Sequence, residues 1–295
     1  LLSTVGIFAD PISLLEGKLE ARSLQAQTLE EKKQKADQLV QQGVQQVETS
    51  KFQEAAKSYQ EALQIYQQMN DRAGIANSWE GLGTVSWKVG KYDQARDYFQ
   101  RSLEIAQEIN DRAIVSKSLR GLGIVADLLG KYEKARDYYQ RSLTIAREIE
   151  YRVGIANSLN NLGNVADILS KYEEAIDYYQ RSLAIKEEIG DRAGIAGSLN
   201  NLGIVSGKLG NYEEAMDYYQ RSLAIAEEIS DRAGIAKSLN NLGNVYRDLG
   251  KYEEAIDYHQ RSLAIKKEIG DLVGIAGSLN NLGNVSQNLG NYEEA

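Results

Sequence analysis

The feature that most constrains this chain is a motif of about 40 residues that returns along most of its length without an insertion. Each copy reads as a segment close to DRAGIAxSLNNLGNVxxxLG followed by one close to KYEEAIDYYQRSLAIxxEIG. The copies start at Asp71, Asp111, Tyr151, Asp191, Asp231 and Asp271. A fixed period of this length indicates a solenoid, in which one small structural unit is stacked many times.

Both halves of the motif carry apolar and small residues at the spacing of an α-helix, which places them on one face. In the copy at 71–110 the first stripe contains Ile75, Trp79, Leu82, Ser86 and Val89. The second contains Tyr92, Ala95, Phe99, Ser102, Ala106 and Ile109. Because a single helix pair cannot bury both stripes, neighbouring pairs must stack. The sequence therefore predicts an all-α fold, a right-handed superhelical α-solenoid of antiparallel helix pairs.

The joints between the predicted helices carry residues suited to helix ends. Aspartate opens most copies of the motif, where an N-cap oxygen is needed, and Gly190 and Gly270 suit a left-handed residue at the end of a helix. The copy at 151–190 has Glu150 and Tyr151 at this joint, so we expect the loosest joint there. Gly83 and its counterparts lie in mid-helix, where glycine costs about 1 kcal/mol against alanine, and close helix packing is the expected compensation.

A family resemblance rests on the pattern W-x-x-L-G followed by Y-x-x-A-x-x-x-F. Its residues are Trp79, Leu82, Gly83, Tyr92, Ala95 and Phe99. This pattern resembles the tetratricopeptide repeat signature. The resemblance covers residues 31 to 295 and implies a superhelical scaffold that binds peptides or proteins. The chain departs from the family pattern in two ways. Ser102 and its counterparts replace the alanine of the second helix, and the proline that usually ends the repeat is missing.

The longer repeat, with its NNLGN and GDRAGIA segments, narrows the resemblance further. It is similar to the 40-residue subclass in kinesin light chains and G-protein-modulating polarity adaptors, and most similar to bacterial arrays coupled to caspase-like CHAT protease domains. The expected organisation begins with a leader or extra helix at 1–27 and a degenerate first repeat at 28–70. Repeats follow at 71–110, 111–150, 151–190, 191–230 and 231–270, with a truncated repeat at 271–295.

A binding groove is expected on the side of each first helix that lies opposite its packed stripe, since the concave surface of a solenoid is its usual contact area. The predicted groove residues are Asn77, Glu80, Thr84, Trp87, Lys117, Arg120, Asp127, Asn157, Asn160, Asn164, Asp167, Asn200, Lys237, Asn240, Asn244, Arg247, Asn280, Asn284 and Gln287. An asparagine side chain offers a donor and an acceptor together, so such a ladder can hold the backbone of an extended peptide.

An alternative assigns these asparagines to the scaffold alone, where they would bond to neighbouring repeats. The adjacent column, Asn161, Asn201, Asn241 and Asn281, is the better candidate for that role. Two further functional alternatives stay open. The array is either the regulatory arm of a larger enzyme, such as a CHAT protease with its catalytic domain beyond residue 295, or a self-assembling module.

Composition argues against several other classes. A net charge of -8 disfavours phosphate backbones and anionic lipid, so neither nucleic acid nor membrane insertion is expected. The chain contains no cysteine and a single histidine, His259, which occupies the aromatic slot held elsewhere by Phe99 or tyrosine. Glu253 and Glu254 recur in other copies at a helix start and favour the helix dipole. We therefore predict a non-enzyme without cofactor or metal that binds protein or peptide.

The ends of the chain leave its compartment open. It begins at Leu1 and stops at Ala295 in the middle of a motif, so we expect a fragment. A leading helix from Ile12 to Ala26 is favoured here, and the alternative is that residues 1–8 are the tail of a signal-peptide apolar region. Cytoplasmic location is favoured, with export as the other possibility.

Overall fold

A computed structural model describes residues 11–290 of the chain, with side chains described from residue 28 onward. This part of the chain contains only helices, with no strand. They are α1 (Pro11–Glu48), α2 (Phe52–Met69), α3 (Arg72–Lys88), α4 (Tyr92–Glu108), α5 (Arg112–Leu128), α6 (Tyr132–Glu148), α7 (Arg152–Ile168), α8 (Tyr172–Glu188), α9 (Arg192–Lys208), α10 (Tyr212–Glu228), α11 (Arg232–Asp248), α12 (Tyr252–Glu268) and α13 (Leu272–Asn288). The all-α prediction is confirmed.

The predicted leader at 1–27 falls on residues whose side chains lie outside the described part, although α1 begins at Pro11. Residues 291–295 of the predicted truncated repeat lie outside it as well. In the rest of the chain, each copy of the motif up to residue 270 holds one helix pair, and the described part of the last copy holds α13. No helix of the described residues is both long enough and apolar enough to cross a membrane.

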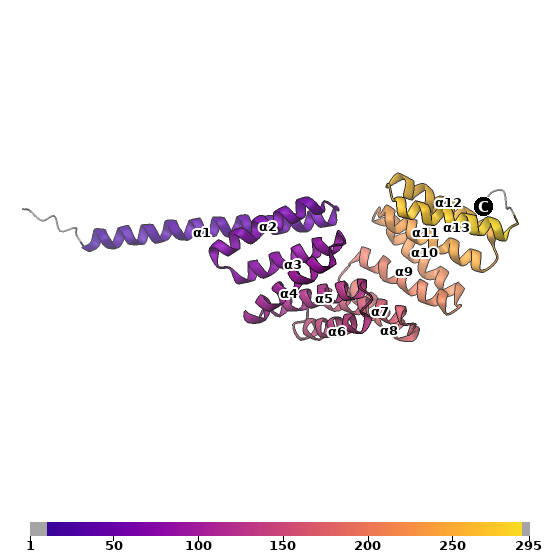
Figure 1. Cartoon of the computed structure of the whole chain (residues 1–295), viewed down its shortest axis with the longest axis horizontal. Coiled ribbons are helices and arrows are strands. Elements are labelled where there is room, and N and C mark those ends of the chain that lie inside the picture. The colour runs from indigo at the N-terminus through magenta and orange to yellow at the C-terminus, as the bar shows by residue number, and fades with distance from the viewer. Residues whose placement is uncertain (1–10, 291–295) are drawn as a thin grey trace, which may run out of the picture. The chain divides into compact units, whose positions relative to one another are not determined.

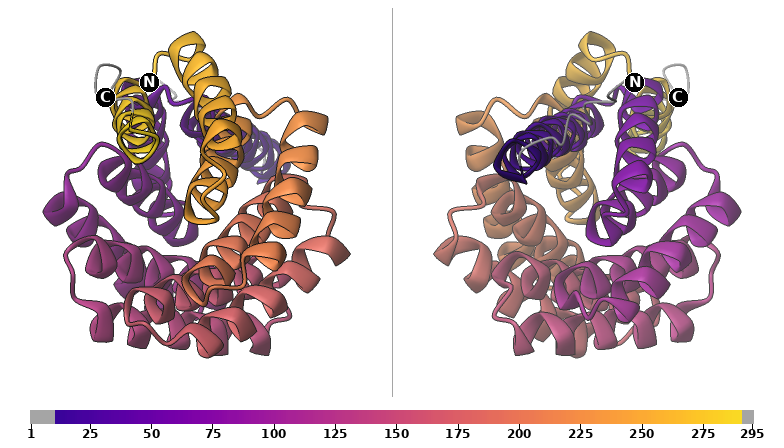
Figure 2. Two further views of the ribbon diagram at one scale, coloured as in Figure 1. Left: turned by 90° about the vertical axis from the view of Figure 1, so that its right-hand side faces the viewer. Right: turned by 90° about the vertical axis from the view of Figure 1, so that its left-hand side faces the viewer.

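The helices group into two compact units, Leu1–Val125 and Ala126–Ala295. The first contains α1 to α4 and most of α5, and the second contains the end of α5 and α6 to α13. Within each unit, helices that follow one another along the chain are neighbours in space, as the gradual change of colour in Figures 1 and 2 shows. In Figure 1 the N-terminal part of α1 extends beyond its partner α2. Each unit is thus a stack of antiparallel helix pairs, the local architecture of a solenoid.

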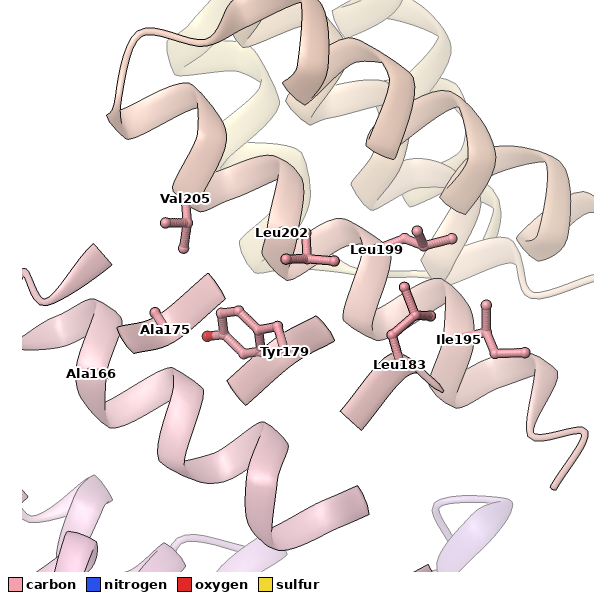
Figure 3. Packing of buried hydrophobic residues seen from close by; sticks show 8 residues of the cluster. All are labelled: Ala166, Ala175, Tyr179, Leu183, Ile195, Leu199, Leu202 and Val205. Carbon is pink, nitrogen blue, oxygen red and sulfur yellow. The ribbon is translucent and has the colours of Figure 1, made fainter. Parts of the chain in front are cut away.

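The hydrophobic core runs between successive pairs. Figure 3 shows Tyr179 and Leu183 of α8 facing Leu199 and Leu202 of α9, the first helix of the next pair. All four side chains are buried. The apolar stripe of one pair is therefore covered by its neighbour, which is the physical reason that the motif must be repeated.

The mid-helix glycines lie directly under the aromatic residue of their own pair. A Cβ atom on Gly83 would come within 2.7 Å of the Phe99 ring, and one on Gly163 within 2.6 Å of Tyr179 Cε1. Phe99 also lies against Gly121 of the following pair, where a Cβ would come within 2.5 Å. The expected close packing at these glycines is confirmed.

The predicted joints have the expected geometry. Asp71 accepts a hydrogen bond from the Gly74 amide at 2.9 Å, and the other opening aspartates cap their helices in the same way. Gly190 and Gly270 adopt left-handed φ angles of 71° and 70°. Tyr151 makes no side-chain cap bond, yet its backbone angles resemble those at Asp191. The greater looseness of this joint stays a prediction.

The predicted stripe of the first helix was too narrow and included one wrong residue. Val89 is 44% exposed because it lies at the C-cap of α3, beyond the packed turns. Ala76, Ser78 and Val85 are buried, although the stripe omitted all three. The helix is packed against both α2 and α4, so a wider arc of its surface is covered.

Buried serines join the two helices of a pair, which explains the departure from the family's alanine. Ser102 Oγ donates to the carbonyl oxygen of Ala76 at 2.8 Å and accepts from Ser118 Oγ of the next pair at 2.8 Å. Ser222 repeats this arrangement with Ala196 and Ser238. Since each of these serines is buried, the hydroxyls satisfy one another inside the core.

Candidate functional site

The first helix of each pair lies on the inner side of a local curve. In the second unit, α7 contacts α9, α9 contacts α11 and α11 contacts α13 directly. No such contact joins α8, α10 and α12 in the described part of the chain. Because the first helices are closer together than the second ones, the stack bends toward them. The predicted groove residues therefore lie on the concave side of this unit.

Most of the predicted groove residues are half-buried, as expected for side chains on a concave surface. In the first unit, these are Asn77, Glu80, Thr84 and Trp87 of α3 and Lys117 and Arg120 of α5. In the second unit, they are Asp127, Asn157, Asn160, Asn164, Asp167, Asn240, Asn244 and Arg247. Lys237, Asn280, Asn284 and Gln287 are exposed, whereas Asn200 is buried.

The asparagines of neighbouring first helices are bonded to one another. Asn241 Nδ2 donates to Asn200 Oδ1 at 2.7 Å, and Asn281 Nδ2 donates to Asn240 Oδ1 at 3.1 Å. Asn201 Nδ2 likewise approaches the side-chain oxygens of two α7 asparagines, at 3.4 and 3.5 Å. The scaffold role predicted for Asn201, Asn241 and Asn281 is confirmed by these bonds.

The same bonds alter the role expected for three asparagines of the predicted groove, one on each of α7, α9 and α11. Asn160, Asn200 and Asn240 use their oxygens as acceptors inside the scaffold. A ligand can therefore bind mainly to the N–H donors of these residues, and not to a donor and an acceptor on the same side chain. Asn200, only 3% exposed, has very little surface for a ligand to reach.

A pocket of about 270 Å³ opens among these helices in the second unit. It is lined by Asp127, Asn164, Asp167, Ile168, Tyr179, Asn201 and Ile204. Asn164 Oδ1 accepts from the Tyr179 hydroxyl at 2.8 Å, which fixes the position of both polar groups. Three predicted groove residues thus meet in one hollow.

The charges around this pocket are unevenly compensated. Asp167 Oδ1 lies 2.6 Å from Lys208 Nζ and forms an ion pair. Burial raises the pKa of Asp127 above its usual value, and no positive charge offsets that effect. On α11, burial lowers the pKa of Lys237 although the side chain is exposed, which fits a cation surrounded by the walls of a groove.

A second hollow of about 300 Å³ lies in the first unit. Asn77 and Lys117 line it together with residues of α1 and α2. Tyr66 donates from its hydroxyl to Asp37 Oδ1 at 2.5 Å, and Lys33 Nζ lies 3.1 Å from Asp37 Oδ2. The concave side of each unit is therefore polar and hollowed.

His259 occupies the predicted aromatic slot. It is fully buried, and a Cβ on Gly243 would come within 2.8 Å of its Cε1 atom. Neither ring nitrogen has a hydrogen-bond partner within the described residues. Burial lowers the pKa of His259 to about 4, and Arg247 and Lys266 add to this effect. The imidazole is thus a neutral core ring at pH 7.

Sequence reasoning did not place three of the residues in or beside the second-unit pocket in a site. Tyr179 was assigned to the core and Asn201 to the scaffold, and Lys208 was not considered. Tyr179 is almost fully buried, but its hydroxyl oxygen reaches the pocket, whereas Lys208 is exposed and acts through its ion pair with Asp167. The sequence could have indicated this site, because a tyrosine, Tyr179, occupies the position that phenylalanine has at Phe99.

Comparison with known structures identifies relatives of the fold. The chain of BtubC from P. vanneervenii is 22% identical with a TM-score of 0.62, covering 82% of this chain and 92% of that one. A Rap protein in complex with competence and sporulation factor is 19% identical with a TM-score of 0.64, covering 87% and 76%. A Signal Transduction ATPase with Numerous Domains from Pyrococcus horikoshii is 18% identical with a TM-score of 0.67, covering 86% and 41%.

Comparison of sequences identifies the family. A search of curated protein sequences gave no significant match. Tetratricopeptide repeat models match residues 39–108, 74–148, 129–188 and 194–268, and a further one matches 275–295. These matches span most of the chain and together cover the helices from α2 to α12. The chain belongs to the tetratricopeptide repeat family.

Proposed function

We propose that the chain is a non-catalytic scaffold that binds a peptide or protein segment on the face formed by its first helices. The observation that carries this proposal is the ladder of asparagines across α7, α9 and α11, in which Asn160 and Asn240 are half-buried and Asn200 is buried. Their oxygens are engaged within the scaffold, so the remaining N–H donors suit the backbone carbonyl groups of an extended segment. The Rap protein complexed with competence and sporulation factor has the same fold and supports this choice of ligand class.

The proposal includes no catalytic residue. The single histidine is enclosed in the core, and the paired glutamates at 253 and 254 stand in the first turn of α12. Carboxylates in this position stabilise the helix through its dipole. Reversible capture of a partner requires no cofactor.

The test compares a groove variant with a matched variant on the outer helices. A nonapeptide selected by phage display on the immobilised chain serves as the probe, and its affinity is measured by calorimetry. The groove variant combines Asn157→Ala, Asn244→Ala and Lys237→Ala, which spares the inter-repeat amide bonds. The control combines Asp177→Ala, Asp217→Ala and Asp257→Ala, at exposed positions of α8, α10 and α12.

We expect the groove variant to lose at least tenfold in affinity, or about 1.4 kcal/mol, while the control keeps the affinity of the original chain. Equal affinity of the two variants would exclude the concave face. Failure to select any peptide would count against peptide binding itself. Thermal unfolding of each variant establishes that the fold is retained.

One observation favours self-association as a second candidate. Leu272 and Val273 at the start of α13 are 78% and 85% exposed. The five preceding copies of the motif have arginine at the first position of this helix, followed by alanine in all but the copy at 151–190, and Arg192 and Arg232 pair there with Glu228 and Glu268. Light scattering over a concentration range tests this idea, because Leu272→Arg with Val273→Ala should reduce any association that the original chain shows.

The regulatory-arm alternative has support from one similar structure. The Pyrococcus horikoshii ATPase is described as having a tetratricopeptide repeat sensor. A regulatory arm would use the same binding face, with the captured segment as its signal. The affinity test above therefore applies to both forms of the proposal.

A further inference from the structure

The pocket between α5, α7 and α9 has a negative character from two sources. Asp127 lies in the last turn of α5 and Asp167 in the last turn of α7. The C-terminal end of a helix carries a partial negative charge, so a carboxylate at this position is unfavourable and a cation is favourable. The partial negative charges at the C-terminal ends of both helices therefore add to the charges of the two carboxylates.

Of these two carboxylates, only Asp167 has a positively charged partner within the described residues. Lys208 neutralises Asp167 through their 2.6 Å contact. Asp127 forms no ion pair within the described residues, and burial raises the pKa of its carboxyl group. A charged group held against its solvation and against a helix dipole weakens the fold, so its presence calls for a compensating role.

The remaining walls of the pocket suit a long side chain with a polar end. Tyr179 is 2% exposed and presents its hydroxyl, while Asn164 and Asn201 are linked to each other at 3.4 Å. Ile168 and Ile204 supply apolar surface. Lysine and arginine have this combination of an apolar stem and a charged head.

Two glycines leave positions without side chains on the neighbouring face of α9. A Cβ on Gly197 would meet no atom within 4 Å, and one on Gly207 would meet only Ala215 at 3.9 Å. In contrast, Gly203 of the same helix lies under the Tyr219 ring. Packing therefore gives no reason for Gly197 or Gly207, although each weakens the helix by about 1 kcal/mol. Glycine at such a place permits another backbone to approach closely.

We propose that the pocket formed by Asp127, Asn164, Asp167, Tyr179 and Asn201 receives a lysine or arginine side chain of a bound polypeptide. The backbone of that polypeptide lies along the uncovered face of α9. The inference rests on the proposed function and adds to it the chemical class of residue that is recognised. A neutral or acidic side chain would leave Asp127 without a partner and is disfavoured.

The experiment uses two pools of fluorescein-labelled nonapeptides that differ only in the central residue, arginine or citrulline. Citrulline has nearly the shape of arginine but no charge. The other positions hold mixtures of alanine, serine, asparagine and leucine, and binding to the whole chain is followed by fluorescence anisotropy. We expect the arginine pool to bind at least tenfold more tightly than the citrulline pool.

Two variants assign the preference to the pocket. Asp127→Asn should abolish the preference for arginine, whereas Asp137→Asn, at an exposed carboxylate paired with Arg141, should leave it unchanged. Lys208→Gln removes the internal cation from Asp167, so it should strengthen binding of the arginine pool. Circular dichroism of each variant confirms that the helices are retained.

The outcomes separate this inference from the proposed function. Equal binding of the two pools overturns the cation pocket and leaves peptide binding intact. A preference for arginine that survives Asp127→Asn, or that weakens in Lys208→Gln, also overturns it. If neither pool binds, the cation pocket is rejected, while the proposed function is decided independently by the phage-selected peptide and the outer-helix control.

Discussion

Gly203 of α9 lies directly under the aromatic ring of Tyr219, so that a Cβ atom on the glycine would stand 2.6 Å from Cε1 of the tyrosine. The same relationship joins Gly163 to Tyr179 and Gly243 to His259. It fixes the distance between the two helices of a pair, since no larger residue fits beneath the ring. The interior of each pair is therefore close-packed at a single repeated point.

Two substitutions on α9 should have opposite effects on stability. Gly203→Ala forces the Tyr219 ring to move and should destabilise the chain by about 1–3 kcal/mol. Gly197→Ala meets no neighbouring atom and should stabilise it by up to about 1 kcal/mol through helix propensity. Urea unfolding of both variants measures the two changes, and a loss of stability in Gly197→Ala would show that the open space is required by the fold.

The two hydroxyls of a buried serine pair should contribute non-additively to the stability of the chain. Ser222→Ala removes the bond to the Ala196 carbonyl and leaves Ser238 without that partner, so we expect a loss of about 1–2 kcal/mol. Ser222→Ala combined with Ser238→Ala should cost less than the sum of the single changes, because the double variant leaves no buried hydroxyl unpaired. A double-mutant cycle by chemical unfolding provides the measurement. Strict additivity would mean that the two hydroxyls do not interact.

Acid should weaken the chain through His259. Since its pKa in the folded state is lowered to about 4, the unfolded chain binds the proton first as pH falls. The stability associated with the neutral ring is present above the unfolded pKa near 6.5 and is lost progressively from there down to about pH 4. His259→Tyr has no such titration, so its advantage over the original chain should grow by about 1–2 kcal/mol between pH 7.5 and pH 5.

Urea unfolding of both proteins at the two pH values measures this difference. His259→Phe serves as a control, because it removes the titration without adding a hydroxyl. An advantage that is the same at both pH values would mean that the ring does not titrate with folding.

Restoring the missing N-cap of α7 should stabilise the chain. Tyr151 stands in the N-cap position of α7 with φ of -75° and ψ of 85°, close to the -76° and 82° of Asp191, which does cap its helix. Tyr151→Asp should therefore supply a bond to the Gly154 amide and stabilise the chain by about 0.5–2 kcal/mol. Asp191→Ala, the reverse change, should destabilise it by a similar amount.

Thermal unfolding gives the stability of these cap variants, and hydrogen exchange of the first α7 amides reports on the joint itself. Faster exchange at α7 than at α9 in the original chain would support the predicted looseness. Exchange at equal rates would show that backbone geometry alone holds the joint.

The sequence by itself determined the helices and their caps. The spacing of Ala95, Phe99 and Ser102 defined the buried face of a second helix, and each opening aspartate marked a helix start. These features are local, because helix periodicity and N-capping involve residues only a few positions apart. The repetition of the motif then implied the stacking, since every copy carries the same uncovered stripe.

Only the tertiary structure decided which polar groups are already satisfied. Asn200 and Asn160 looked equivalent in the sequence, yet Asn200 is buried and bonded to Asn241 from the next repeat. Asp127 and Asp167 occupy the same column, but a lysine 41 residues further along the chain pairs with Asp167 alone. Such contacts join residues about one repeat apart, and their geometry depends on how the helices pack. The physical reason is that periodicity specifies which face a side chain lies on, whereas its hydrogen-bond and charge partners are set by the neighbouring repeat.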